Sequence, residues 1–149
     1  MQRPAGPLRS RTREGSALIL SGSTVAFDLK GGHEAGAEAR RALIAGDGEL
    51  PATVRGDVLL LLTELVTNAV RHSGLRPDES LHVELDQWAE RVQVKVVDTG
   101  TQFTRIRPGA REDQSGGWGL LLVDRIADTW GVGPTESGTC VWFEIDFKR

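Results

Sequence analysis

Hydrophobic and polar residues alternate along four stretches of the chain, with the period of two that is typical of β-strands. The stretches are STVAFDLK from Ser23, SLHVELDQW from Ser80, RVQVKVVD from Arg91 and TCVWFEIDF from Thr139. Only the short connection at Ala89 and Glu90 separates the second stretch from the third, which predicts a β-hairpin. Each stretch has one hydrophobic face, so the strands should form a sheet that buries one side.

Three other stretches have the wider spacing of hydrophobic residues that is typical of helices. They are HEAGAEARRALIAGDG, ELPATVRGDVLLLLTELVTNAVRHSG and GWGLLLVDRIADTWGV. The second begins with Pro51 and Thr53, which suit a helix start, and Gly74 suits its end. In the third, one side carries Leu120, Val123, Ala127 and Trp130, which predicts a helix that continues past residue 126.

The predicted order is strand, helix, helix, two strands, helix, strand. A hairpin and polar outer faces favour one mixed, mainly antiparallel sheet with helices packed on one face, an α+β fold in a two-layer α/β sandwich. The 149 residues suit a single domain over residues 21–149, preceded by a basic tail over residues 1–20 that we expect to be disordered.

Composition excludes several functional classes. The net charge of -3 and the pI near 5.6 argue against nucleic acid as the main partner, although arginines in the tail could bind anions. No run of about 18 apolar residues predicts a membrane span, and the run ALIL at residues 17–20 is too short for a signal peptide. A lone cysteine, Cys140, rules out an intrachain disulfide and fits a cytoplasmic protein.

The long central helix carries a polar stripe beside its apolar face. Glu64, Asn68 and His72 are spaced by four residues, so they lie along one line of the helix. A solvent-facing stripe is one interpretation. The other is the wall of a site, because a carboxylate can accept a proton and an amide oxygen can bind Mg²⁺.

Two polar residues lie on the hydrophobic faces of strands. One is in the strand before the third predicted helix, and the other is in the strand after it. Asp98 has the parity of Val94 and Val96, and Thr139 has that of Val141. Both side chains should therefore face the helices, and a buried carboxylate needs partners. A strand-end aspartate in a turn and an ordinary strand threonine are the alternatives.

A glycine-rich segment, GGWGL, stands directly before the third helix. Glycines at a helix N-terminus leave backbone N–H groups free to bind phosphate, although a flexible loop has the same composition. The segment is not a P-loop, since GxxxxGK[ST] occurs nowhere in the chain.

Together these motifs resemble the GHKL, or Bergerat, family of ATP-binding domains, which includes gyrase-type ATPases and histidine kinases. TELVTNAVRHS resembles its N box, VVDTG and GGWGLLLV its two glycine boxes, and GTCVWFEI its closing strand. The resemblance spans residues 23–147 and is greatest to the RsbW/SpoIIAB-like branch, the bacterial anti-sigma-factor serine/threonine kinases.

The resemblance implies ATP and Mg²⁺ as cofactors and gives each motif a role. Asn68 would bind the Mg²⁺ on the ATP phosphates, and Glu64 would be the catalytic general base. Asp98 would bind the adenine amino group, with Gly100 under the ring and Thr139 beside it. The segment 101–116 would be the ATP lid. Backbone N–H groups near the phosphates would come from Gly117, Gly119 and Leu120.

One position departs from the family pattern. The first glycine box usually continues as DxGxG, and here Gln102 stands at the second glycine. Glutamine lacks the backbone range of glycine, so lid closure or nucleotide affinity should differ. This departure keeps open a non-catalytic, nucleotide-gated binding module as the alternative to a kinase.

By the same resemblance, the partners would be a sigma factor, an anti-anti-sigma protein and a second copy in a homodimer. Trp142 lies on the sheet face away from the helices, where it could mark an interface or pack locally. A histidine-kinase catalytic domain is disfavoured, because the stretch before the N box leaves no room for a two-helix phosphoacceptor domain.

Overall fold

The computed structural model describes residues 22–46, 50–72, 79–98, 117–136 and 138–148. The tail, the lid segment 101–116, Gly100 and Gln102 lie outside these residues. The elements are β1 Ser23–Lys30, α1 Ala35–Gly46, α2 Ala52–His72, β2 Ser80–Gln87, β3 Arg91–Asp98, α3 Gly117–Ile126, β4 Thr129–Thr135 and β5 Gly138–Asp146.

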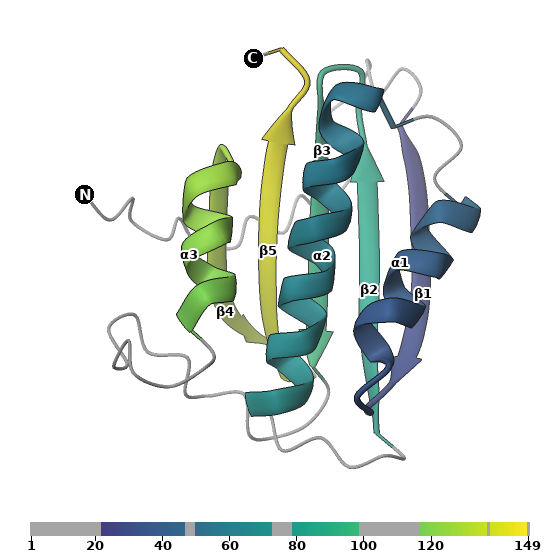
Figure 1. Cartoon of the computed structure of the whole chain (residues 1–149), viewed down its shortest axis with the longest axis vertical. Coiled ribbons are helices and arrows are strands. Elements are labelled where there is room, and N and C mark those ends of the chain that lie inside the picture. Colours follow the sequence, from purple (N-terminus) through teal and green to yellow (C-terminus); the bar gives the residue numbers. More distant parts are fainter. Residues whose placement is uncertain (1–21, 47–49, 73–78, 99–116, 137, 149) are drawn as a thin grey trace.

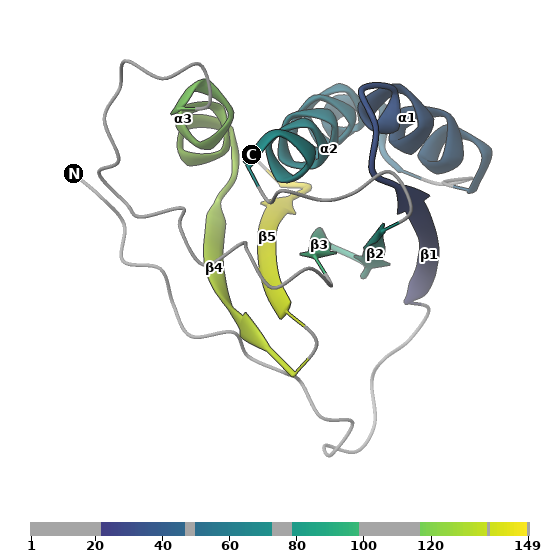
Figure 2. The ribbon, with the colours of Figure 1, turned by 90° about the horizontal axis from the view of Figure 1, so that it is seen from below.

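The strands form one sheet in the order β1-β2-β3-β5-β4, and every pairing is antiparallel. Seen along the strands, all three helices lie on one side of the sheet, with α2 between α1 and α3 (Figure 2). The two-layer α+β prediction is therefore confirmed. None of the helices in the described ranges is long and apolar enough to cross a membrane.

The core lies between the sheet and the helices. Burial alternates residue by residue along β2 and β3, so the period of two seen in the sequence sets which side faces α2. The register aligns these faces across the sheet, with Val83 opposite Val96 and Val94 opposite Phe143. The α2 residues that close the core are Val58, Leu61, Leu62, Leu65, Val66 and Ala69.

Helices α1 and α2 approach closely at one glycine. A Cβ atom at Gly36 would lie 2.9 Å from the Thr67 hydroxyl oxygen and 3.3 Å from the Thr63 methyl carbon. The Thr63 hydroxyl already donates a 2.7 Å hydrogen bond to the Leu59 carbonyl, which holds that side chain in place. The absence of a side chain at Gly36 thus fixes how near α1 stands to the part of α2 that carries Asn68.

The predicted third helix is too long. It ends at Ile126, and the segment from Thr129 to Thr135 is strand β4, which pairs with β5 at the edge of the sheet. Trp130 and Val132 face the helices with period two, while Gly131 and Pro134 disfavour a helix. The indole N–H of Trp130 donates a 3.0 Å hydrogen bond to Asp124 Oδ1, so this strand residue contacts α3 without belonging to it.

The far side of the sheet is lined by polar contacts. Lys95 Nζ lies 2.9 Å from Glu84 Oε1 and 3.2 Å from Asp86 Oδ2, and the Thr24 hydroxyl donates to Asp86 Oδ1 over 2.7 Å. Burial by itself raises the pKa of Asp86, but the hydrogen bonds and the Lys95 charge outweigh it and lower that pKa. These contacts explain the polar positions of the strand pattern.

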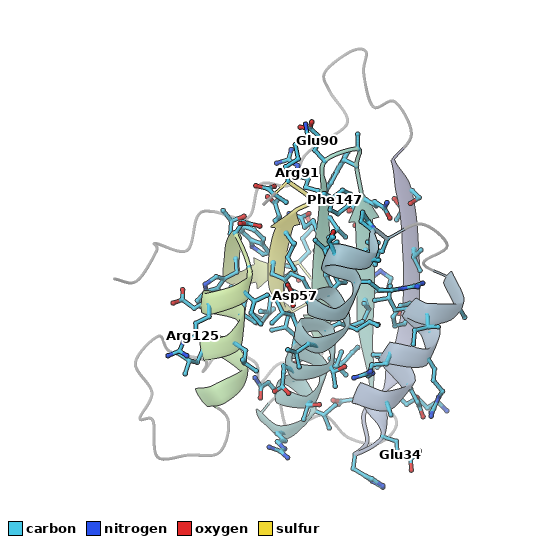
Figure 3. The ribbon with its side chains drawn as sticks, turned by 45° about the horizontal axis from the view of Figure 1, so that its top comes forward. Glu34, Asp57, Glu90, Arg91, Arg125 and Phe147 are labelled. Carbon is cyan, nitrogen blue, oxygen red and sulfur yellow. The ribbon has the colours of Figure 1, made fainter. Side chains whose placement is uncertain are left out.

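One end of the sheet is closed by the β2–β3 hairpin, as the sequence predicts. The Trp88 N–H donates to the Arg91 carbonyl over 2.8 Å, and the Phe147 N–H donates to the Glu90 carbonyl over 2.7 Å. Figure 3 shows Glu90, Arg91 and Phe147 gathered at this end. The residues singled out for their chemistry belong to the opposite end.

Candidate functional site

Four segments that are distant in sequence meet at the end of the sheet opposite the hairpin. The last turns of α2, the end of β3, the start of β5 and the start of α3 all lie at the lower end of the molecule in Figure 1. The antiparallel topology produces this arrangement, because β3 runs toward this end and β5 starts from it. The motifs predicted from the sequence are therefore brought to one end of the fold.

Asn68 is a buried polar residue on α2. Its side chain is 6% exposed, and its amide nitrogen Nδ2 is buried without a hydrogen-bond partner in the described structure. A buried donor in this condition is costly unless a ligand pairs with it. Burial rules out the solvent-facing interpretation of the polar stripe at this residue.

The other members of the stripe differ. Glu64 lies one turn before Asn68 and is half-buried, so its carboxylate stands on the same line of the helix with access to water. His72 is the last residue of α2, and its side chain lies outside the described part of the structure. The structure thus places an acid and an amide on one line of α2.

Asp98 and Thr139 form a cross-strand pair between β3 and β5. Asp98 is fully buried and Thr139 is 9% exposed. Their register with the buried inner positions Val96 and Val141 places both on the side of the helices, as predicted. Residues directly opposite each other in an antiparallel pair have Cβ atoms about 4.5–5.5 Å apart, so a carboxylate and a hydroxyl stand side by side. The sequence pattern gives the face on which each residue lies, and the structure adds that the two residues stand directly opposite each other.

The same row of the sheet continues on both sides of this pair. Leu81 on β2 pairs with Asp98, and Pro134 on β4 pairs with Thr139. Leu81 is fully buried and Pro134 is exposed. The sequence pattern places Leu81 on the inner face, but strand register is not visible in the pattern, so its pairing with Asp98 was not predicted. The pairing of Pro134 with Thr139 was missed because β4 was not predicted.

Helix α3 begins at Gly117, so its first turn includes Gly119 and ends at the half-buried Leu120. The first N–H groups of a helix have no partner inside that helix and carry the positive end of its dipole. This turn therefore presents backbone N–H groups of the kind that can bind an anion at the site end of the molecule.

The chemistry of this end is that of a site for a polar ligand with both hydrogen-bonding and anionic parts. A buried carboxylate and hydroxyl can bind a donor–acceptor edge, while an amide and helix N–H groups can bind oxyanions. Within the described ranges, no group of three His, Cys, Asp or Glu could hold a metal ion. A divalent cation would therefore need ligand oxygens in addition to Asn68.

The comparison with known families identifies the domain. The model of the histidine kinase-like ATPase domain matches residues 32–145, well over half of the chain. A comparison with curated proteins found no match. The match spans all the segments that meet at the site end and agrees with the five-stranded antiparallel sheet under three helices. The chain therefore belongs to the histidine kinase-like ATPase domain family, the GHKL type of ATP-binding domain.

Proposed function

We propose that this ATPase-type domain is an anti-sigma factor of the RsbW/SpoIIAB-like branch with serine/threonine kinase activity. It would transfer the γ-phosphoryl group of ATP to an anti-anti-sigma partner and bind a sigma factor, acting as a homodimer. The observation that carries the proposal is the buried Asn68 amide one turn from Glu64, at the same end as the Asp98–Thr139 pair.

In this proposal the two halves of the site bind the two halves of ATP. Asp98 accepts a hydrogen bond from the adenine amino group, with Thr139 beside it on the neighbouring strand. The N–H groups of the first turn of α3 bind phosphate oxygens. Gly100 and the lid segment 101–116 would complete the adenine and phosphate contacts.

The residues of α2 would act on the reacting end of the nucleotide. The side chain of Asn68 fits Mg²⁺ through its amide oxygen, a ligand type that Mg²⁺ takes, while its Nδ2 stays available as a hydrogen-bond donor to a ligand oxygen. Mg²⁺ would neutralise charge on the phosphates. Glu64, half-buried and one turn away, would orient the attacking serine hydroxyl and accept its proton.

A transfer assay tests this function. The full chain is incubated with ATP labelled at the γ-phosphate, Mg²⁺ and a panel of anti-anti-sigma domains, beside the Glu64→Gln variant. We expect label on a partner serine with the wild type and at least about a hundredfold slower transfer with Glu64→Gln. Equal transfer by both proteins would remove the assignment of Glu64 as the base.

Gln102 supports one alternative, a nucleotide-gated binding module without phosphoryl transfer. It replaces a glycine of the family pattern at the start of the lid segment. Calorimetric binding of ATP together with no label on any partner, but ATP-dependent capture of one, would favour this module over the kinase.

A further inference from the structure

The side of the sheet away from the helices carries an apolar patch that the proposed function does not use. We define the outer patch as Val97, Cys140 and Trp142, with Gly131 and Gly133 of β4 beside them. The register places Cys140 between Val97 and Gly133, and Trp142 beside Gly131. The patch is apolar although most outward positions of the sheet are polar.

Two residues of the outer patch are buried where no described element covers them. Cys140 is 1% exposed and Trp142 is 9% exposed, yet neither belongs to the core between sheet and helices. All described helices lie on the opposite side of the sheet (Figure 2). Burial also raises the pKa of the Cys140 thiol, to about 11.

Trp142 also has an unused donor. Its ring lies against the backbone of Gly131, where an added Cβ would stand 2.9 Å from the indole nitrogen. That nitrogen, Nε1, is buried and has no hydrogen-bond partner in the described structure. A buried indole N–H normally finds an acceptor, so a backbone carbonyl from outside the described residues would complete this surface.

The segment that precedes β1 has the composition to supply such a covering. Residues 17–20 are Ala-Leu-Ile-Leu, the apolar run within an otherwise polar and basic stretch. Farther from β1, Arg9, Arg11 and Arg13 could reach the carboxylates of the same side, among them Glu84 and Glu144. A segment of this kind matches the outer patch in apolar character and its surroundings in charge.

The length of chain also fits. The register aligns four residues across the sheet: Ser23 on β1, Gln87 on β2, Val92 on β3 and Ile145 on β5. Ser23 is therefore three strand spacings from Ile145, and Trp142 lies three residues from Ile145 along β5. At about 4.8 Å between strands and about 3.3 Å per residue, the distance from Ser23 to Trp142 is roughly 17 Å. An extended chain covers that distance in about five residues, which brings Leu18 to the outer patch.

We propose that the outer patch is the docking surface for residues 17–20 of this chain, which pack against Trp142 and Cys140 and accept the Trp142 indole hydrogen bond. This inference does not depend on the nucleotide site. In the full chain the fold would then have three layers: the helices, the sheet and the docked segment. The outer patch would be covered by the chain itself and not by a second copy.

Disulfide trapping tests the proposal, because Cys140 is the one cysteine of the sequence. The full-length Ala17→Cys variant is oxidised with diamide, beside Ser10→Cys as a control with a longer tether. We expect an intramolecular disulfide in Ala17→Cys that forms at least about tenfold faster than in Ser10→Cys, because docking raises the effective concentration. Equal rates, no disulfide, or a disulfide-linked dimer would each overturn the proposal, the last in favour of a second copy.

Thiol labelling gives an independent measurement. In the full chain Cys140 should react slowly with a thiol reagent, and Leu18→Asp should speed the reaction at least about tenfold by releasing the run from the patch. Leu8→Asp changes a leucine outside the run and should leave the rate unchanged, while circular dichroism confirms that both variants stay folded. An unchanged rate in folded Leu18→Asp would refute docking.

Discussion

Asn68 is the residue whose surroundings point most directly to a ligand. It is buried on a helix that otherwise turns hydrophobic side chains inward, and its amide nitrogen has no partner within the described structure. A side chain retained for folding alone would have its hydrogen bonds made inside the protein. In the proposed function Asn68 contributes to binding at a cost in stability, and that cost can be measured.

Replacement of Asn68 by alanine should not destabilise the protein without ligand. The change removes an unpartnered buried amide and raises helix propensity by about 0.5 kcal/mol, so the thermal midpoint should stay the same or rise. Leu62→Ala, at a fully buried position of the same helix, is the control and should cost about 2–5 kcal/mol. A large fall in the midpoint of Asn68→Ala would show that the amide has a structural role.

The sequence predicts which residues belong to the candidate site, but it does not predict how they are arranged relative to one another. Strand parity correctly turns Asp98 and Thr139 inward, because the period of two is a local property. That the two stand directly opposite each other depends on strand register, which follows from the whole sheet. The pairing of Pro134 with Thr139 was missed for a different reason, because strand β4 was not predicted at all.

Among the elements, the contact between α1 and α2 holds the site helix in place. Gly36→Ala would put a Cβ 2.9 Å from the Thr67 hydroxyl, next to Asn68 in the chain. We expect it to lower the free energy of unfolding by about 1 kcal/mol, since the clash exceeds the gain in helix propensity. Chemical denaturation measures this change.

Two further variants sharpen that measurement. Gly56 lies in α2 with open space around it, so Gly56→Ala should instead stabilise the protein by about 0.5–1 kcal/mol. In a Thr67→Ala background, Gly36→Ala should lose most of its penalty, because the 2.9 Å clash with the hydroxyl is gone and only the 3.3 Å contact with the Thr63 methyl carbon stays. A penalty that persists in the double variant would place the strain elsewhere.

Asp86, on the outer side of the sheet, makes the stability of the fold depend on pH in the acid range. The pKa of Asp86 is lowered from its ordinary value of 3.8: burial opposes the shift, and the hydrogen bond from Thr24 and the charge of Lys95 produce it. Its contribution is thus present above pH 3.8 and is lost as the pH falls through the lower pKa of the folded protein. The thermal midpoint of Asp86→Asn should therefore fall less than that of the wild type below about pH 5. Parallel pH curves for the two proteins would contradict this.

The elements themselves were predictable to different degrees. Four strands with clean alternation and two helices with glycine or proline boundaries follow from local pattern. Strand β4 does not, because Gly131, Gly133 and Pro134 have low strand propensity and only Trp130 and Val132 carry its inner face. An edge strand tolerates such residues, since it pairs on one side and its partner β5 is strongly hydrophobic.

At the scale of the whole molecule, the two ends of the sheet differ in their residues and contacts. The hairpin end is closed by short backbone hydrogen bonds, while the other end gathers the polar residues of α2, β3 and β5 and the first turn of α3. The chain belongs to the histidine kinase-like ATPase domain family, and a single end of the sheet with gathered polar residues agrees with one nucleotide site in such a domain. Kinase activity and nucleotide-dependent binding of a sigma factor are proposals, and both require a nucleotide site at this end of the sheet.

Calorimetric titration with ATP and Mg²⁺ tests that requirement most directly. The wild type should bind one ATP per chain, and Asn68→Ala should weaken binding at least about tenfold by removing the amide from the phosphate end of the site. Gln93→Ala removes an amide from the outer side of the sheet and should bind like the wild type. No binding by the wild type, or equal affinity in Asn68→Ala, would contradict a nucleotide site at this end of the fold.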